Sequence, residues 1–133
     1  MIAVDTNVLV RLLVKDDAAQ TRKVVELFKR LDADDDRAHV SDIVVCELVW
    51  VLEACYAFDR KQIASTPGQV LAARQLCFDS ADRLLRALSA FKIGRGDLAD
   101  YVIREHAKAA GCDEIVTFDK ILWKENGYRA PDA

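Results

Sequence analysis

Acidic residues stand where an apolar segment ends or where a helix is expected to begin. Asp5 follows an apolar run at the N-terminus, and Asp119 follows the apolar stretch that starts at Ile115. Asp97 and Asp100 lie three residues apart, so they share one face of a helix start. Carboxylates that cluster without His or Cys are hard oxygen ligands, which suit Mg²⁺ or Mn²⁺. Because such an ion activates water and stabilises charge on a phosphate group, the pattern indicates metal-dependent phosphate chemistry.

Glu47 is a further candidate because its sequence surroundings are apolar. It is the only charged residue from Ile43 to Leu52. Its helical neighbours three and four positions away are all apolar: Ile43, Val44, Trp50 and Val51. We expect such a helix to be buried nearly all round, where an ionised carboxylate is costly unless it is paired or holds a metal. The alternatives are a partly exposed Glu47 that reaches solvent and a buried Arg–Glu pair.

The other acids also have purely structural explanations. Asp97 suits a helix N-terminus, and Asp100 has Arg104 four residues on as an ion-pair partner. Asp119 suits the cap of a short helix that starts at Lys120. Against this, two like charges on one helical turn repel each other, and a divalent cation between them relieves the repulsion. Taken together, the acids indicate a metal site more specifically than any one of them does.

The elements that must position these acids alternate along the chain. We predict strands over residues 1–4, 37–40, 75–78 and 114–118, and helices over residues 8–14, 18–31, 42–56, 59–73, 80–91 and 97–110. Thr6 or Asn7 is expected to cap the first helix, and Ser65-Thr66-Pro67 to interrupt the fourth. This alternation predicts an α/β fold with a central, mainly parallel sheet of four to five short strands. Ligands bind outside the carboxyl ends of such strands, so we expect Asp5 and Asp119 on the same rim.

The composition limits the class of protein. The 133 residues are 52% apolar and 31% charged, which predicts one folded domain over residues 1–133. The net charge of −3 excludes a protein that coats nucleic acid by bulk basicity, but not a local basic surface. No segment approaches the roughly 18 apolar residues of a membrane span, and we find no signal peptide, so a cytoplasmic protein is expected. The cysteines lack zinc-ligand spacing and are expected to be reduced thiols in the core.

The order and spacing of these segments resemble a PIN domain, and most of all the VapC-type toxins of bacterial and archaeal toxin–antitoxin pairs. The resemblance covers nearly the whole chain. The segments that carry it are IAVDTNVLVRLL, VSDIVVCELVWVLE, DLADYVIREHAKAAGCD and IVTFDK. It implies a three-layer α/β/α fold. Residues 62–75 match the family poorly, so the resemblance does not indicate whether that segment helps to select a substrate or a partner.

The resemblance implies a Mg²⁺- or Mn²⁺-dependent endoribonuclease that hydrolyses RNA without a side-chain nucleophile. The acids of the family fall on Asp5, Glu47, Asp100 and Asp119, and the motif D-x-x-I-x-x-H-A carries the third of them. Asp97 is often acidic in similar proteins and is a candidate to share the metal. Supporting roles fall on residues beside these acids. Thr6 and Asn7 are expected to order the Asp5 loop, and Thr117 to hydrogen-bond a carboxylate.

An acidic chain needs local basic residues to hold RNA. Four basic residues lie near the proposed rim in the sequence: Lys15, Arg95, Lys120 and Lys124. We expect some of them to contact phosphates of the RNA. The alternative is that they are solvated surface charges. The resemblance further implies a homodimer and a cognate VapB-like antitoxin that inserts a segment into a groove by the active site. Trp50 either lines such a surface or packs in the core.

Rival functions remain open from the sequence. One is a PIN nuclease that processes RNA and is not a toxin. Another is a phosphoryl-transfer protein of the phosphatase or receiver kind, but it needs a second acid next to Asp5, where Thr6 and Asn7 stand instead. The last is a non-catalytic binding module with an acidic surface pocket, in which the acids only cap helices.

Overall fold

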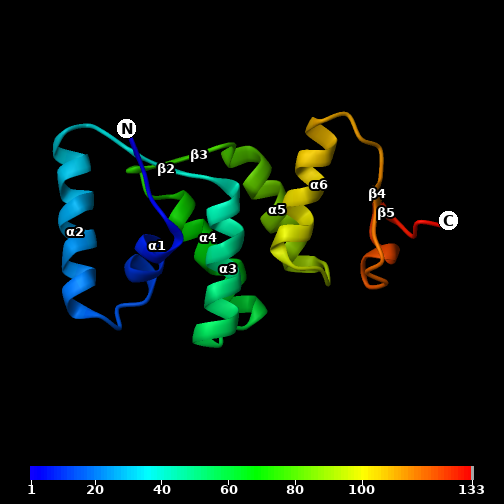
Figure 1. The fold of residues 1–133 in the computed structure, drawn as a ribbon, viewed down its shortest axis with the longest axis horizontal. Coiled ribbons are helices and arrows are strands. Elements are labelled where there is room, and N and C mark those ends of the chain that lie inside the picture. The colour runs from blue at the N-terminus through cyan, green and yellow to red at the C-terminus, as the bar shows by residue number, and fades with distance from the viewer. Residues whose placement is uncertain (133) are drawn as a thin grey trace. The chain divides into compact units, whose positions relative to one another are not determined.

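The computed structural model describes residues 1–132, without the side chain of Pro67. The chain divides into two compact units, Met1–Asp79 and Ser80–Ala133, which we call unit 1 and unit 2. Each unit combines helices with short strands (Figure 1). The single domain over residues 1–133 stays a prediction, and its last residue lies outside the described residues.

Unit 1 is built from three parallel strands and four helices. In chain order its elements are β1 (Ile2–Ala3), α1 (Thr6–Leu13), α2 (Ala18–Ala33), β2 (Ala38–Val40), α3 (Asp42–Tyr56), α4 (Arg60–Leu71) and β3 (Leu76–Phe78). The strand order is β1-β2-β3, and the register places Ala38 opposite both Ile2 and Leu76. Because the strands are parallel, their carboxyl ends share one edge of the sheet, and Asp5 and Asp79 follow at that edge.

The core of unit 1 joins its helices to the sheet. Leu9 of α1, Val40 of β2, Leu52 of α3 and Ile63 of α4 have no exposed surface. Burying one such side chain stabilises the fold by about 1.5–3 kcal/mol, so these contacts fix the elements that follow each strand. The predicted bounds of α3, residues 42–56, match those observed.

The start of α3 is held from two sides. Ser41 caps the helix by accepting a hydrogen bond from the Val44 N–H at 3.2 Å. Asp79 reaches it from the end of β3 and accepts from the Asp42 N–H at 3.0 Å. The other oxygen of Asp79 lies 3.2 Å from Nε2 of His39. These bonds fix the turn from β2 into α3 against β3.

Helix α4 is continuous, so the predicted interruption at residues 65–67 is wrong. Asp59 and Gln62 form a capping box at the start of α4, six residues before Ser65, so the helix already has its N-terminal cap there. The hydroxyls of Ser65 and Thr66 both donate to the carbonyl of Gln62, at 2.9 and 2.8 Å. These side chains therefore bond back into the same helix and do not start a new one.

Unit 2 contains a helix pair and a small parallel sheet. Its elements are α5 (Ala81–Ile93), α6 (Leu98–Ala109), β4 (Ile115–Val116), the 3₁₀ helix η1 (Leu122–Lys124) and β5 (Tyr128–Arg129). Helices α5 and α6 bury Leu84, Phe91 and Tyr101. Glu105 of α6 is also buried, where it pairs with Arg86 of α5. Strands β4 and β5 pair in parallel, and Tyr128 lies opposite Ile115.

The predicted α/β class with parallel strands is confirmed. The strands of residues 1–132 lie in two sheets, one of three strands and one of two, where the sequence led us to expect one sheet. None of the described helices has both the length and the apolar character that crossing a membrane requires. All the cysteines are free, but the expected core position is wrong for Cys55 and Cys112, which are exposed near the ends of α3 and α6.

Candidate active site

Asp5 lies at the junction of β1 and α1, where it is exposed. Its Oδ1 accepts a hydrogen bond from the Thr6 N–H at 2.7 Å, and Asp5 is the N-cap of α1. The prediction that Thr6 or Asn7 caps this helix is therefore wrong. The helix begins earlier than predicted, so the capping position falls on Asp5. The second carboxylate oxygen of Asp5 has no protein partner within residues 1–132.

The two residues after Asp5 have different surroundings. Thr6 is 4% exposed, and its Oγ1 finds no hydrogen-bond partner in the described part of the chain. Asn7 is exposed and lines a cavity of about 350 Å³ together with Val8 and Arg11. Thr6 is thus held by burial, which fixes the backbone next to Asp5. The supporting roles of Thr6 and Asn7 at a metal site stay predictions.

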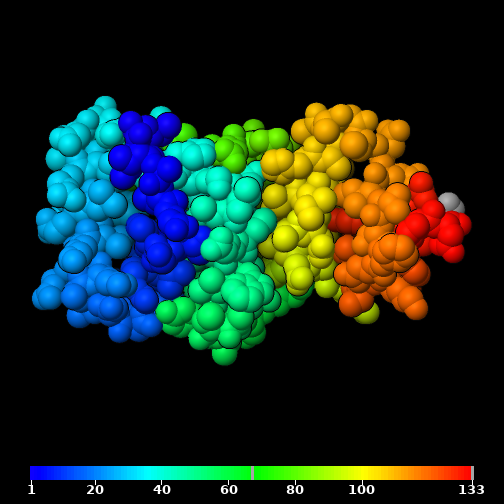
Figure 2. Space-filling view, viewed as in Figure 1, coloured from blue at the N-terminus to red at the C-terminus, as the bar shows by residue number. Residues whose placement is uncertain are grey.

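Glu47 lies on the exposed side of α3. Ile43 and Trp50, one helical turn to either side, are 76% and 66% exposed. Helices α1 and α3 lie side by side in unit 1 (Figure 2). The prediction that α3 is buried nearly all round is wrong, because only its other side packs into the core, through Val45, Leu48, Val49 and Leu52. Glu47 therefore needs no partner for stability, and only its position makes it a candidate.

Asp97 and Asp100 stand together at the start of α6. Asp97 is the N-cap, and its N–H donates to Oδ2 of Asp100 at 2.8 Å. Burial raises the pKa of Asp100 above its ordinary value, and the charges of Asp97 and Asp119 raise it further, against the effect of the hydrogen bond. The ion pair with Arg104 is not formed. Arg104 instead donates to the carbonyl of Asn126 at 2.9 Å, so Asp100 keeps its like-charge neighbours.

Asp119 lies in a tight turn after β4. Its N–H donates to Oγ1 of Thr117 at 3.0 Å, and its own Oδ1 accepts from the Ile121 N–H at 3.0 Å. The expected bond from Thr117 to a carboxylate stays a prediction. The Thr117 hydroxyl sits two residues before Asp119, where a local turn brings it to the backbone N–H. Thr117 still fixes Asp119, through the main chain.

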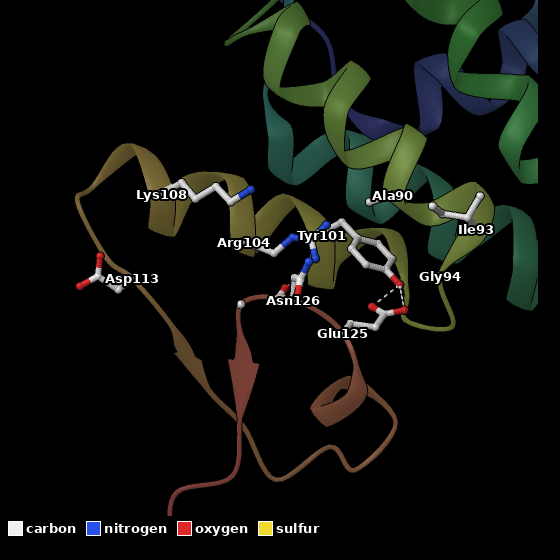
Figure 3. A pocket seen from close by; sticks show the side chains of 10 residues that line it. Ala90, Ile93, Gly94, Tyr101, Arg104, Lys108, Asp113, Glu125 and Asn126 are labelled. Carbon is white, nitrogen blue, oxygen red and sulfur yellow. Dashed lines mark hydrogen bonds between the residues drawn. The ribbon is translucent and has the colours of Figure 1, made fainter. Parts of the chain in front are cut away.

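A hydrogen-bond network holds the turn before α6. The Tyr101 hydroxyl, which is buried, lies 2.9 and 2.7 Å from the two carboxylate oxygens of Glu125 (Figure 3). It also accepts from the Gly96 N–H at 2.9 Å, while Glu125 accepts from the Arg95 N–H at 2.9 Å. A Cβ on Gly94 would lie 1.9 Å from the same hydroxyl oxygen. The turn that leads into Asp97 is therefore closely fitted around Tyr101.

Sequence reasoning missed Tyr101 and Glu125. The glycines on either side of Arg95 were a signal, since glycine allows close approach of another group to the backbone. The sequence did not show which side chains approach this backbone, because Glu125 lies 24 residues beyond Tyr101.

The basic residues proposed for RNA are all exposed: Lys15, Arg95, Lys120 and Lys124. None of their side chains forms an ion pair with a carboxylate of residues 1–132. Their charges are therefore available at the surface, and their contact with RNA stays a prediction.

The predicted metal ligands are divided between the units. Asp5 and Glu47 belong to unit 1, whereas Asp97, Asp100 and Asp119 belong to unit 2. Within residues 1–132, no three His, Cys, Asp or Glu side chains gather closely enough to hold a metal ion. In unit 2 the carboxylates nevertheless affect one another through space, as the raised pKa of Asp100 indicates.

Comparison with protein families decides what the chain is. The model of the PIN domain family matches residues 2–125. The chain belongs to the PIN domain family. No curated protein matches it. The match runs through both units of this PIN domain and includes every predicted acid.

The fold agrees with the family. Helices α1–α6 and the parallel strands of this PIN domain are consistent with the expected three-layer α/β/α fold. PIN domains are generally metal-dependent nucleases, so the chain has a nuclease-type fold. The oxygen ligands predicted from the sequence are of the type that such metal sites use.

Proposed function

We propose that this PIN domain is a Mg²⁺- or Mn²⁺-dependent endoribonuclease and the toxin of a type II toxin–antitoxin pair. The observation that carries the proposal is the family match over residues 2–125, a range in which all the proposed acids lie. The resemblance of the opening and closing segments to VapC-type toxins supports the narrower role.

The proposed metal ligands are Asp5, Glu47, Asp100 and Asp119, with Asp97 as a further ligand. Their chemistry fits a hard divalent cation, because every donor is a carboxylate oxygen. Asp5 has one carboxylate oxygen without a protein partner. Asp100 is half-buried and close enough to other acids for their charges to raise its pKa, so a cation there would relieve repulsion.

The reaction we propose is hydrolysis of an RNA phosphodiester bond by water. When bound, the ion makes water more acidic and stabilises the negative charge that develops on the phosphate. Asp5, Glu47 and Asp100 would hold it directly or through water. Asp119, in the turn that Thr117 fixes, would act with Asp97 to hold a second ion or to orient the attacking water. Thr6 and Asn7 support the Asp5 loop. The exposed cations hold the RNA backbone by its phosphates: Lys15, Arg95, Lys120 and Lys124.

The partners are also part of this proposal. We propose a homodimer in the cytoplasm and a cognate VapB-like antitoxin that covers the active site. Trp50 and Ile43 are exposed on either side of Glu47 on α3. Exposed apolar residues grouped in this way are typical of interaction surfaces, which supports a protein partner at this helix.

One observation favours a second candidate, a non-catalytic binding module. Asp5 caps α1, Asp97 caps α6, and Asp119 accepts a hydrogen bond within its own turn. Each of these acids thus has a structural role that needs no metal. The two candidates differ in whether the chain binds Mn²⁺ and cuts RNA.

The test is to induce the wild type and Asp5→Asn in cells, then to sequence the ends of the RNA fragments. Asn caps a helix about as well as Asp, so the variant should keep the fold and lose only the charged ligand. We expect new RNA ends and growth arrest with the wild type and neither with the variant. Equal cleavage by both proteins would contradict the assignment of Asp5.

The remaining outcomes separate the alternatives. New RNA ends without growth arrest would indicate a nuclease that is not a toxin. Absence of cleavage by the purified wild type, together with no Mn²⁺ binding at millimolar concentration, would favour the binding module and contradict the nuclease.

A further inference from the structure

A cavity of about 560 Å³ lies in unit 2, behind the turn that leads into α6. Its walls come from the end of α5, from α6 and from the turn before β5. The residues that carry the argument are Tyr101, Arg104, Lys108, Asp113, Glu125 and Asn126. The volume is within the range of sites that hold small ligands, about 300–1,000 Å³.

Arg104 is a rigidly held cation in this cavity. Its guanidinium carbon lies 5.1 Å from the centre of the Tyr101 ring and 5.5 Å from that of Tyr128. Its Nη1 donates to the carbonyl of Asn126 at 2.9 Å. No carboxylate pairs with Arg104 in the described part of the chain. A half-buried charge without a counter-ion is unfavourable, so Arg104 is suited to bind an anion.

Lys108 adds a second cation one helical turn further along the same face of α6. Its ammonium extends along the helix on the side of Arg104 (Figure 3). Nζ of Lys108 forms an ion pair with Oε2 of Glu105 at 3.5 Å, and Arg86 also pairs with Glu105. Because the Lys108 side chain is 63% exposed and Glu105 would keep Arg86 as its partner, Lys108 can turn toward a ligand. Two cations spaced by one turn, about 5.4 Å, can follow a charged chain along α6.

Within residues 1–132, neither acid that lines the cavity, Asp113 or Glu125, forms an ion pair with Arg104 or Lys108. Glu125 is bound to the Tyr101 hydroxyl and to the Arg95 N–H. Asp113 lies on the α6–β4 loop, at the other end of the cavity from Glu125 (Figure 3). The central wall is therefore formed by Arg104, whose planar guanidinium can bind two phosphate oxygens at once.

We propose that Arg104 and Lys108 form a binding subsite for backbone phosphates of the RNA. The proposal rests on the proposed nuclease function and extends it. Asp100 precedes Arg104 by four residues, so the acid and the two cations follow one face of α6. An RNA strand with its scissile phosphate at Asp100 would place neighbouring phosphates along this face. The subsite binds the backbone and reads no base, since phosphate contacts carry no sequence information.

The experiment measures binding of fluorescein-labelled single-stranded RNA to the full chain by anisotropy. EDTA prevents cleavage, and salt is varied between about 50 and 200 mM. We expect Arg104→Met to weaken binding about 10-fold at low salt and to reduce the slope of log affinity against log salt by about one, because one phosphate contact is lost. Lys108→Met is expected to reduce the slope by a similar amount. Arg104→Lys should restore most of the slope, since it keeps the charge.

Arg22→Met is the matched control, since Arg22 is an exposed arginine of α2 in unit 1. It should leave the slope unchanged. A purely structural role of Arg104 would lower the melting temperature of Arg104→Met and leave its salt slope at the wild-type value. Wild-type slopes in both Arg104→Met and Lys108→Met would overturn the subsite, even where Arg104→Met folds poorly, because Lys108 is exposed.

Cleavage assays keep this result separate from the proposed function. If the wild type cuts RNA while Arg104→Met and Lys108→Met bind RNA with the wild-type salt dependence, the proposed nuclease function would be kept. The phosphate subsite would be contradicted. A wild type that cuts no RNA with Mg²⁺ or Mn²⁺ would contradict the proposed function whatever the slopes are.

Discussion

In unit 1 the predicted acids Asp5 and Glu47 are exposed, whereas in unit 2 Asp100 is half-buried among other carboxylates. Asp5 caps helix α1, and Glu47 lies on the solvent-exposed face of α3. Neither carboxylate is therefore buried without a partner. Asp100 instead faces repulsion that the fold tolerates, next to a turn held by Tyr101. Asp100 therefore keeps like-charge neighbours in the folded state, which is unfavourable for its ionised form.

The largest expected effect on the free energy of unfolding comes from replacing Gly94 of unit 2 by Ala, and Gly68→Ala in unit 1 is its matched comparison. Gly94→Ala in unit 2 would place Cβ 1.9 Å from the Tyr101 hydroxyl oxygen and 2.6 Å from Oε1 of Glu125. We expect it to destabilise the fold by about 3 kcal/mol or more, because it overpacks a buried hydrogen-bond network. Gly68→Ala in unit 1 meets nothing within 4 Å and lies in α4, so it should stabilise by about 0.5–1 kcal/mol.

Urea unfolding of both glycine variants provides the measurement. Similar midpoints for Gly94→Ala and the wild type would contradict the close fit of the turn around Tyr101.

A smaller loss of stability is expected when one acid of an ion pair is neutralised in each unit. Burial alone would raise the pKa of Glu105, but the hydrogen bond from Arg86 and the charge of Lys108 lower it below 4.5. Glu105 therefore stabilises the folded state fully above about pH 4.5, and this contribution is lost as the pH falls through the lower folded-state pKa. Glu105→Gln should cost about 1.5–3 kcal/mol at neutral pH, and less in acid.

The matched variant in unit 1 is Asp32→Asn, whose partner Arg74 is exposed. Surface pairs contribute about 0–1 kcal/mol, so this change should be small. Unfolding curves at neutral and acid pH measure both. A loss for Glu105→Gln that does not shrink in acid would show that the charge of Glu105 is not its cause.

The smallest effect concerns the site acids themselves, measured in EDTA. Asp100→Asn removes like-charge repulsion from Asp97 and keeps an oxygen to accept the Asp97 N–H. We expect it to stabilise the fold by about 0.2–0.5 kcal/mol. Asp5→Asn keeps the cap of α1 and should change stability little. Calorimetric melting of the two variants tests the comparison, and a destabilised Asp100→Asn would contradict the view that Asp100 is an unfavourable neighbour of other acids.

Much of the fold could be predicted from the sequence. Periodicity and caps located the six helices of residues 1–132, and Ser41 before an apolar run gave the start of α3. Short apolar segments gave β1–β4. Strand β5 spans only Tyr128–Arg129, which is too short for an alternating pattern, so no signal located it. The division of the strands into two sheets depends on long-range pairing, which local pattern does not encode.

The candidate site was less predictable than the fold. The positions of Asp5, Asp100 and Asp119 followed from the ends of strands and the start of a helix. The surroundings of Glu47 were wrong, because an apolar helix sequence does not show which of its faces remains exposed. Tyr101 and Arg104 were missed, since their partners are in the turn before β5 and are distant in sequence.

Under the proposed function, Asp5 and Asp100 both take part in the hydrolysis of RNA. The most direct test is the cleavage rate of a labelled RNA with Mn²⁺ for wild type, Asp5→Asn, Asp100→Asn and the double variant. We predict that each single change lowers the rate by on the order of 100-fold or more, and that the double variant is no slower than the worse single one, because residues that act as a unit are not additive. Wild-type cleavage by either single variant, or losses that multiply in the double variant, would contradict the account.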